Sequence, residues 1–155
     1  MLNHMITEPD IFQKAVARSL DYAAQGFPGC DSELIDILPK LNALPGIATL
    51  WSCASHVEVS GSDNQFYIAV AVTEEGMRHM VSIYEELSRI AQPKLDDETG
   101  CSLRLEFSRL IAGLFERPDV RYNIMAIDCI VSDAANKWAL LDSVAEALTN
   151  YRPKR

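Results

Sequence analysis

The segment Gln65–Val72, with the sequence QFYIAVAV, constrains the fold of this 155-residue chain more than any other feature. It is short and nearly continuous in apolar residues, which is typical of a β-strand covered on both faces. Thr73 follows it at once, and apolar residues then recur at helical spacing as far as Pro93. Because Thr73 is a favourable N-cap and Pro93 stops a helix, the pattern predicts a buried strand that leads directly into an amphipathic helix.

Three other segments have the composition or the alternation of strands. Ile47–Trp51 is rich in strand-forming residues and bounded by turns, while Cys101–Leu110 alternates apolar with polar residues. Arg121–Val131 carries apolar residues on both faces, and Asp128 is the acidic residue that interrupts them. We therefore expect about four strands, the last of them buried except at Asp128.

Capping residues and stops delimit three more helices. The first helix is expected near residues 8–25, and the last from Ser132 to Asn150. Another begins at Asp31 and ends at Pro45, with Pro39 inside it. Since proline lacks the N–H group that a helix interior needs, we expect Pro39 to kink or shorten this helix.

The order of these elements is helix, helix, strand, strand, helix, strand, strand, helix. Strands interspersed with amphipathic helices predict an α+β fold, with an antiparallel or mixed sheet of about four strands and helices packed largely on one face. The chain has the length of one domain and shows no internal repeat or linker. Residues 1–155 are therefore expected to form a single domain.

The charge balance and the first residues limit the partners. The chain has 14 lysine and arginine residues against 22 aspartate and glutamate residues, a net charge of -8, which disfavours general nucleic-acid binding. The start MLNHMITEPD is not a secretion signal, and no apolar run is long enough to span a membrane. We expect a cytoplasmic location with no membrane partner, and reduced thiols at four widely spaced cysteines.

The segment Ser52–His56 carries the most reactive side chains and leaves the end of a predicted strand. Cys53 and His56 are spaced so that an imidazole could activate a thiolate nucleophile, and they are the candidate catalytic residues. The alternative is a buried Cys53 and a surface His56. Ser52 and Ser55 join them as candidate ligand-binding residues. A Cys-x-x-His pair supplies only two metal ligands, so no metal site is predicted.

Three charged residues on the later strands are further candidates for ligand binding. The guanidinium groups of Arg104 and Arg121 could each hold a carboxylate or phosphate. The alternative is that such arginines form ion pairs with Glu106 and Asp128. Asp128 itself must be paired, act as a cap or lie near the end of its strand, because an unpaired buried carboxylate is unfavourable.

The segment LPGIATLWSCASH at residues 44–56, followed by a strand at 66–72, resembles uncharacterised bacterial and phage proteins that carry Ser-Cys-x-Gly-His after a strand. It is more distantly similar to the wybutosine-synthesis methyltransferases, whose motif is Ser-Ser-Cys-Ser-Gly-Arg. Ser52 and Cys53 match this motif, whereas Ser55 and His56 stand where that family has Gly and Arg. The resemblance implies a fold and, through the second family, methyl transfer from S-adenosylmethionine to tRNA.

Three functions follow as hypotheses. The first is a soluble domain that binds a small polar ligand, nucleotide-like molecules included, at Ser52–His56. The second is a phage or host regulator that inhibits a basic or nucleic-acid-binding protein through an acidic surface. The third is a tRNA-modifying methyltransferase. Whether a reaction accompanies binding stays open, and the pattern identifies no cofactor or oligomeric state.

Overall fold

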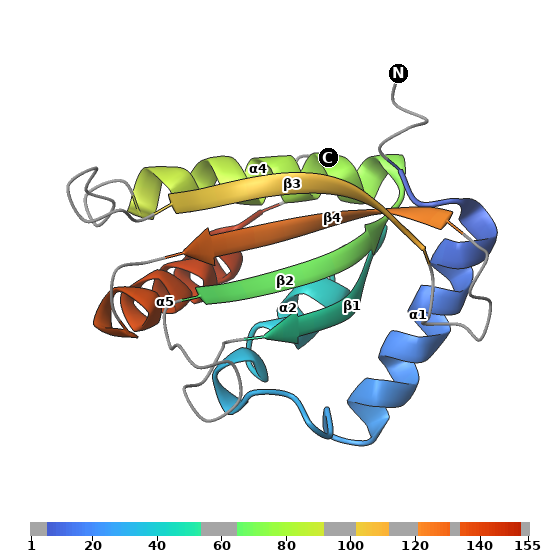
Figure 1. Ribbon diagram of the computed structural model, residues 1–155, viewed down its shortest axis with the longest axis horizontal. Coiled ribbons are helices and arrows are strands. Elements are labelled where there is room, and N and C mark those ends of the chain that lie inside the picture. The colour runs from blue at the N-terminus through green and yellow to red at the C-terminus, as the bar shows by residue number, and fades with distance from the viewer. Residues whose placement is uncertain (1–5, 54–64, 92–101, 112–120, 131–133, 153–155) are drawn as a thin grey trace.

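A computed structural model describes residues 6–53, 65–91, 102–111, 121–130 and 134–152 of the chain (Figure 1). It confirms the predicted α+β fold, with a four-stranded antiparallel sheet between helices. None of the helices in this part of the chain combines the length and the apolar character needed to cross a membrane. The predicted cap of the last helix, Ser132 and Asp133, lies outside the described residues.

The strands are β1 (Ile47–Cys53), β2 (Gln65–Val72), β3 (Ser102–Ile111) and β4 (Arg121–Ile130). Their order in the sheet is β1-β2-β4-β3, and all three neighbouring pairs are antiparallel. β2 and β4 are the two central strands, so each is paired on both sides, and helices cover one face of both strands and part of the other face. This position explains why their sequences are nearly continuous in apolar residues.

Three helices cover one face of the sheet, which we call the inner face (Figure 1). They are α2 (Leu38–Asn42), α4 (Glu74–Ala91) and α5 (Ala134–Asn150). Alternate side chains of the two central strands point into this layer and are buried. They are Phe66, Ile68, Val70, Val72, Met125, Ile127 and Cys129.

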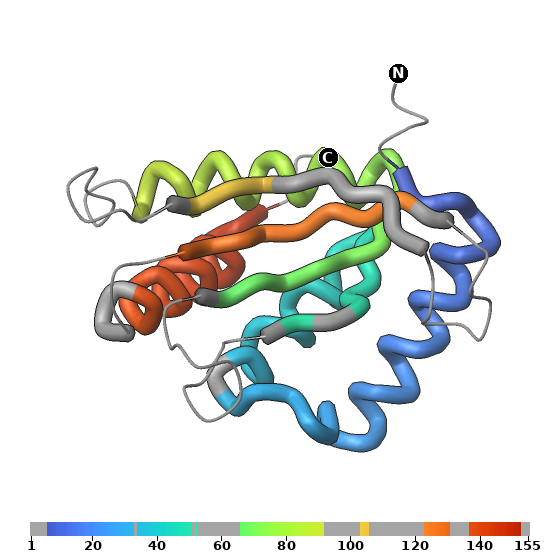
Figure 2. The backbone as a smooth tube through the Cα atoms, in the orientation of Figure 1, coloured from blue at the N-terminus to red at the C-terminus, as the bar shows by residue number. Residues whose placement is uncertain are grey.

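Of the helices in the described residues, α1 (Pro9–Ala24) alone packs on the opposite, outer face. Figure 2 traces α1 along the β1 side of the sheet, well apart from α5. Its buried residues Ile11, Phe12 and Ala15 pack on a patch of mostly small sheet residues. This patch consists of Ala48, Leu50, Ala69, Ala71 and Ile124. The prediction that helices pack largely on one face is confirmed, and α1 is the exception.

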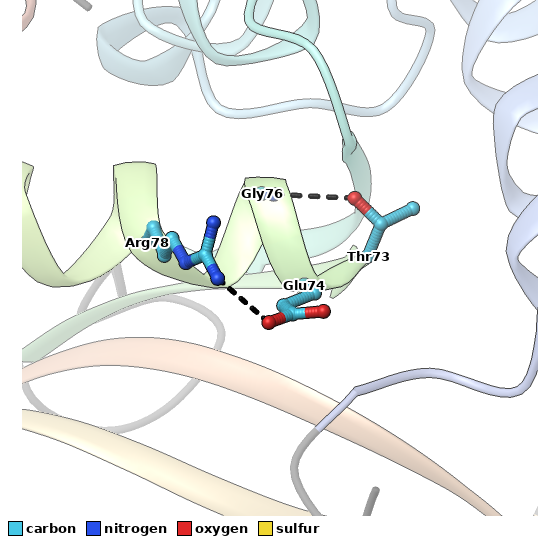
Figure 3. A network of polar contacts seen from close by, with 4 residues as sticks. All are labelled: Thr73, Glu74, Gly76 and Arg78. Carbon is cyan, nitrogen blue, oxygen red and sulfur yellow. Dashed lines mark hydrogen bonds and ion pairs between the residues drawn. The ribbon is translucent and has the colours of Figure 1, made fainter. Parts of the chain in front are cut away.

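The starts of β1 and α4 are joined by direct backbone contact. Thr73 donates its N–H to the carbonyl of Gly46 at 2.9 Å, and its hydroxyl accepts the N–H of Gly76 at 3.2 Å (Figure 3). The predicted N-cap is therefore confirmed. A Cβ atom on Gly76 would lie 1.7 Å from the Gly46 carbonyl oxygen, so only glycine allows this approach.

The segment after α1 differs from the expected single helix from Asp31 to Pro45. It forms a 3-10 turn, η2 (Ser32–Leu34), and then the short helix α2. Pro39 lies in the first turn of α2, where no intrahelical partner for its N–H is required. The prediction of one continuous helix is wrong, and Pro39 lies at the start of α2 rather than inside a helix.

Candidate functional site

Three of the predicted site residues share one row across the sheet. Cys53 pairs with Tyr67, Tyr67 with Asp128, and Asp128 with Arg104, so the row crosses β1, β2, β4 and β3. Neighbouring strands lie about 4.8 Å apart, which places the backbones of Cys53 and Asp128 about 10 Å from each other. The row lies at the end of the sheet where β1 leads into residues 54–64.

Arg104 and Asp128 form an ion pair within this row. Nη2 of Arg104 donates to Oδ2 of Asp128 at 3.2 Å, with the carboxylate side chain 13% exposed and the arginine 54% exposed. The neighbours Ile127 and Cys129 are fully buried, so the predicted buried strand and the pairing of Asp128 are both confirmed. The alternative interpretation of Arg104 as an ion-pair partner is confirmed too, and its charge is already balanced.

Arg121 does not belong to this row. It is the first residue of β4 and pairs with Ile111, seven positions before Asp128. Antiparallel strands rise about 3.4 Å per residue, so the backbones of Arg121 and Asp128 lie roughly 24 Å apart along β4. Ser55 and His56 lie outside the described residues, as does the side chain of Cys53, and the thiolate–imidazole hypothesis stays a prediction.

Ser52 lines a small cavity at the edge of β1. The cavity has a volume of about 100 Å³ and lies between the second half of α1, the edge of β1 and residues 29–38. We call it the α1–β1 cavity. Its lining consists of Arg18, Ser19, Tyr22, Gly29, Cys30, Leu38, Thr49, Leu50 and Ser52.

Arg18 is the charged residue of the α1–β1 cavity. Its Nη1 donates to the carbonyl of Leu50 at 2.5 Å, and Leu50 lies at a β-bulge between Thr49 and Trp51. A guanidinium has five N–H donors, so most of this group remains available. Among the residues that the structure describes, no carboxylate pairs with Arg18. The cavity therefore contains a half-buried positive charge without a described counter-ion.

The neighbouring hydroxyl and thiol groups already donate hydrogen bonds within the protein. The Tyr22 hydroxyl donates to the carbonyl of Pro28, and the Ser19 hydroxyl donates to the carbonyl of Val16 at 2.9 Å. The Cys30 thiol donates to the carbonyl of Asp31 at 3.4 Å. Each hydroxyl oxygen keeps acceptor capacity, so these groups suit a ligand that brings its own O–H or N–H donor.

Sequence reasoning did not identify the residues that α1 contributes. Arg18 and Tyr22 are spaced i, i+4 and Ser19 follows Arg18, so all three project on one side of the helix. This polar stripe beside the apolar one was the available signal. The sequence does not reveal what this stripe faces, because Leu50 and Ser52 belong to a strand that is distant along the chain.

Comparison with protein-family models, with curated proteins and with solved structures gave no match for this chain. The methyltransferase resemblance therefore stays a prediction, and its motif continues from Cys53 into residues outside the described part of the chain. Within the described residues, no three His, Cys, Asp or Glu side chains gather as metal ligands do.

Proposed function

We propose that this protein binds a small carboxylic acid in the α1–β1 cavity, one that also carries an O–H or N–H donor. The observation that carries the proposal is Arg18, a half-buried guanidinium for which the described residues provide no carboxylate. An anion gains more from such a charge than from an exposed one, because less water screens the attraction.

The chemistry of the lining selects the ligand class. A guanidinium presents parallel N–H groups that match the two oxygens of a carboxylate. The oxygens of Tyr22 and Ser19 accept hydrogen bonds from a ligand hydroxyl or amine, and Ser52 adds a further hydroxyl at the β1 side. Small hydroxy acids and amino acids combine both features.

The volume limits the size of what the cavity encloses. Pockets that enclose drug-sized ligands measure about 300–1,000 Å³. The α1–β1 cavity, with about 100 Å³, suits a molecule of a few non-hydrogen atoms or the acidic end of a larger one. A nucleotide-like ligand would place only one small group inside.

Calorimetric titration with glycolate, glycine and acetate tests this proposal. We expect saturable binding of glycolate or glycine, weaker binding of acetate because it lacks the second donor, and a roughly tenfold loss for Arg18→Gln. Lys14→Gln is the matched control, since it removes the same charge from an exposed position one turn earlier on α1. Equal affinities of the Arg18→Gln and Lys14→Gln proteins would refute the proposal.

The alternative function, inhibition of a basic protein through an acidic surface, predicts the opposite response. The affinity for the basic partner would then fall steeply as salt rises from about 50 to about 300 mM, because salt screens attraction between surface charges. Arg18→Gln would leave this affinity unchanged. Exposed acidic residues of the described helices are spread over α1, α4 and α5 rather than gathered on one of them. For this reason we favour the cavity.

A further inference from the structure

A second and larger cavity lies between α4 and the residues that follow α5. It has a volume of about 550 Å³, within the range of small-molecule pockets, and shares no lining residue with the α1–β1 cavity. We call it the α4 groove. Its lining consists of Glu75, Arg78, His79, Ser82, Tyr151 and Arg152.

His79 is the buried polar residue of the α4 groove. The residue is 8% exposed, and its Nδ1 lies 2.6 Å from the Tyr151 hydroxyl oxygen, with the two rings edge to face. Its Nε2 is buried and has no hydrogen-bond partner, because the nearest carboxylate oxygen, Oε1 of Glu75, is 3.7 Å away. A buried ring nitrogen without a partner is uncommon in folded proteins and calls for an explanation.

The partners of Tyr151 determine what His79 offers to a ligand. Burial raises the pKa of Tyr151, although its hydrogen bond with Ser82 opposes this shift, so the phenol is protonated at neutral pH. When the phenol O–H donates to Nδ1 of His79, the proton of the neutral ring lies on Nε2. In this tautomer the unpartnered Nε2 is a hydrogen-bond donor, and a ligand that pairs with it must be an acceptor.

Two arginines give the α4 groove a positive rim. Nη1 of Arg152 donates to the carbonyls of Thr149 at 2.9 Å and Tyr151 at 2.8 Å, and no described carboxylate pairs with it. Arg78 pairs with Glu74 at 2.7 Å and is 70% exposed, so its other N–H groups face solvent (Figure 3). Glu75 is the acidic member among the lining residues and weakens this field.

We propose that the α4 groove binds the phosphate group of a small phosphorylated molecule. Arg78 and Arg152 face its negative charge, while Ser82 and His79 line the same groove with hydrogen-bonding side chains. A phosphate carries several acceptor oxygens and up to two charges, which matches a site with two guanidinium groups and an N–H donor. Glu75 is exposed, and its carboxylate rotates away from Nε2 when the phosphate binds.

Titration with inorganic phosphate and pyrophosphate at constant ionic strength tests this site. We expect saturable binding that Arg152→Gln weakens about fivefold and that Glu75→Gln strengthens about threefold, because the second change removes a competing carboxylate. Arg89→Gln is the control, since Arg89 is also on α4 but pairs with Glu86 outside the groove. Equal affinities in all four proteins, or weaker binding to Glu75→Gln, would overturn the proposal.

Nitrogen-15 NMR of the histidine rings provides a second readout that does not depend on the stability of a variant. Phosphate should shift the Nε2 resonance of His79 along a saturable curve in the wild-type protein. No shift of that resonance at saturating phosphate would overturn the role of His79. The same titration of Arg18→Gln should match the wild type, so this site and the α1–β1 cavity succeed or fail independently.

Discussion

The two faces of the sheet carry different kinds of side chains. On the inner face, the side chains of β2 are large and apolar from Phe66 to Val72, and three helices cover them. The outer face has alanines beneath α1 at one end, and the polar row with Asp128 and Arg104 at the other. The difference indicates that the inner layer carries most of the stability, while the thinner packing between α1 and the edge of β1 leaves room for the α1–β1 cavity.

Truncation of one phenylalanine on each face of the sheet should give the largest changes in the free energy of unfolding. Phe66 is fully buried in the large inner cluster, so Phe66→Ala should reduce the free energy of unfolding by about 3–5 kcal/mol. Phe12 is 8% exposed in the smaller cluster under α1, and Phe12→Ala should cost at least about 1 kcal/mol less. Urea denaturation measures both, and equal losses would contradict the comparison.

Disruption of the backbone contact between Gly46 and Gly76 should give the next largest loss of stability. Gly76→Ala would place a Cβ atom 1.7 Å from the Gly46 carbonyl, so α4 must shift away from the start of β1. We expect a loss of about 2–3 kcal/mol in unfolding free energy, despite the better helix propensity of alanine. Glu85→Ala, at an exposed position of the same helix, should stay within about 0.5 kcal/mol. A Gly76→Ala protein as stable as the wild type would disprove the close contact.

The polar end of the outer face should contribute less to stability than the buried phenylalanines or the Gly46–Gly76 contact. Asp128→Asn removes the charge that faces Arg104, an exposed partner, and should lower the unfolding free energy by about 1 kcal/mol or less. This loss should still be larger than the loss caused by Asp142→Asn, because Asp142 is exposed on α5. A double-mutant cycle with Arg104→Gln isolates the pair, and a coupling energy above about 2 kcal/mol would mean that this end is a structural element.

Much of the fold was accessible from the sequence because its signals are local. The apolar run of β2, the Thr73 cap and the alternation at β3 each depend on neighbours along the chain, and the two strands and the cap are confirmed. The helix expected from Asp31 to Pro45 was wrong, because Pro39 lies in the first turn of α2, where proline is favourable, and not in a helix interior.

The candidate site was only partly accessible, for the opposite reason. Pairing of Arg104 with Asp128 could be anticipated, because a carboxylate in an apolar strand needs a partner. The association of Ser52 with Arg18 and Tyr22 could not, since it depends on where α1 crosses the edge of β1. No periodic pattern encodes such a contact between distant segments.

The proposed carboxylate site can be observed directly at the Arg18 guanidinium. In a glycolate titration at constant ionic strength, nitrogen-15 NMR should show the Arg18 Nε–H resonance shifting along a saturable curve. The corresponding resonance of Arg89, an exposed arginine paired with Glu86, should hardly move. A common, non-saturating shift of both arginines would contradict a specific carboxylate site in the α1–β1 cavity.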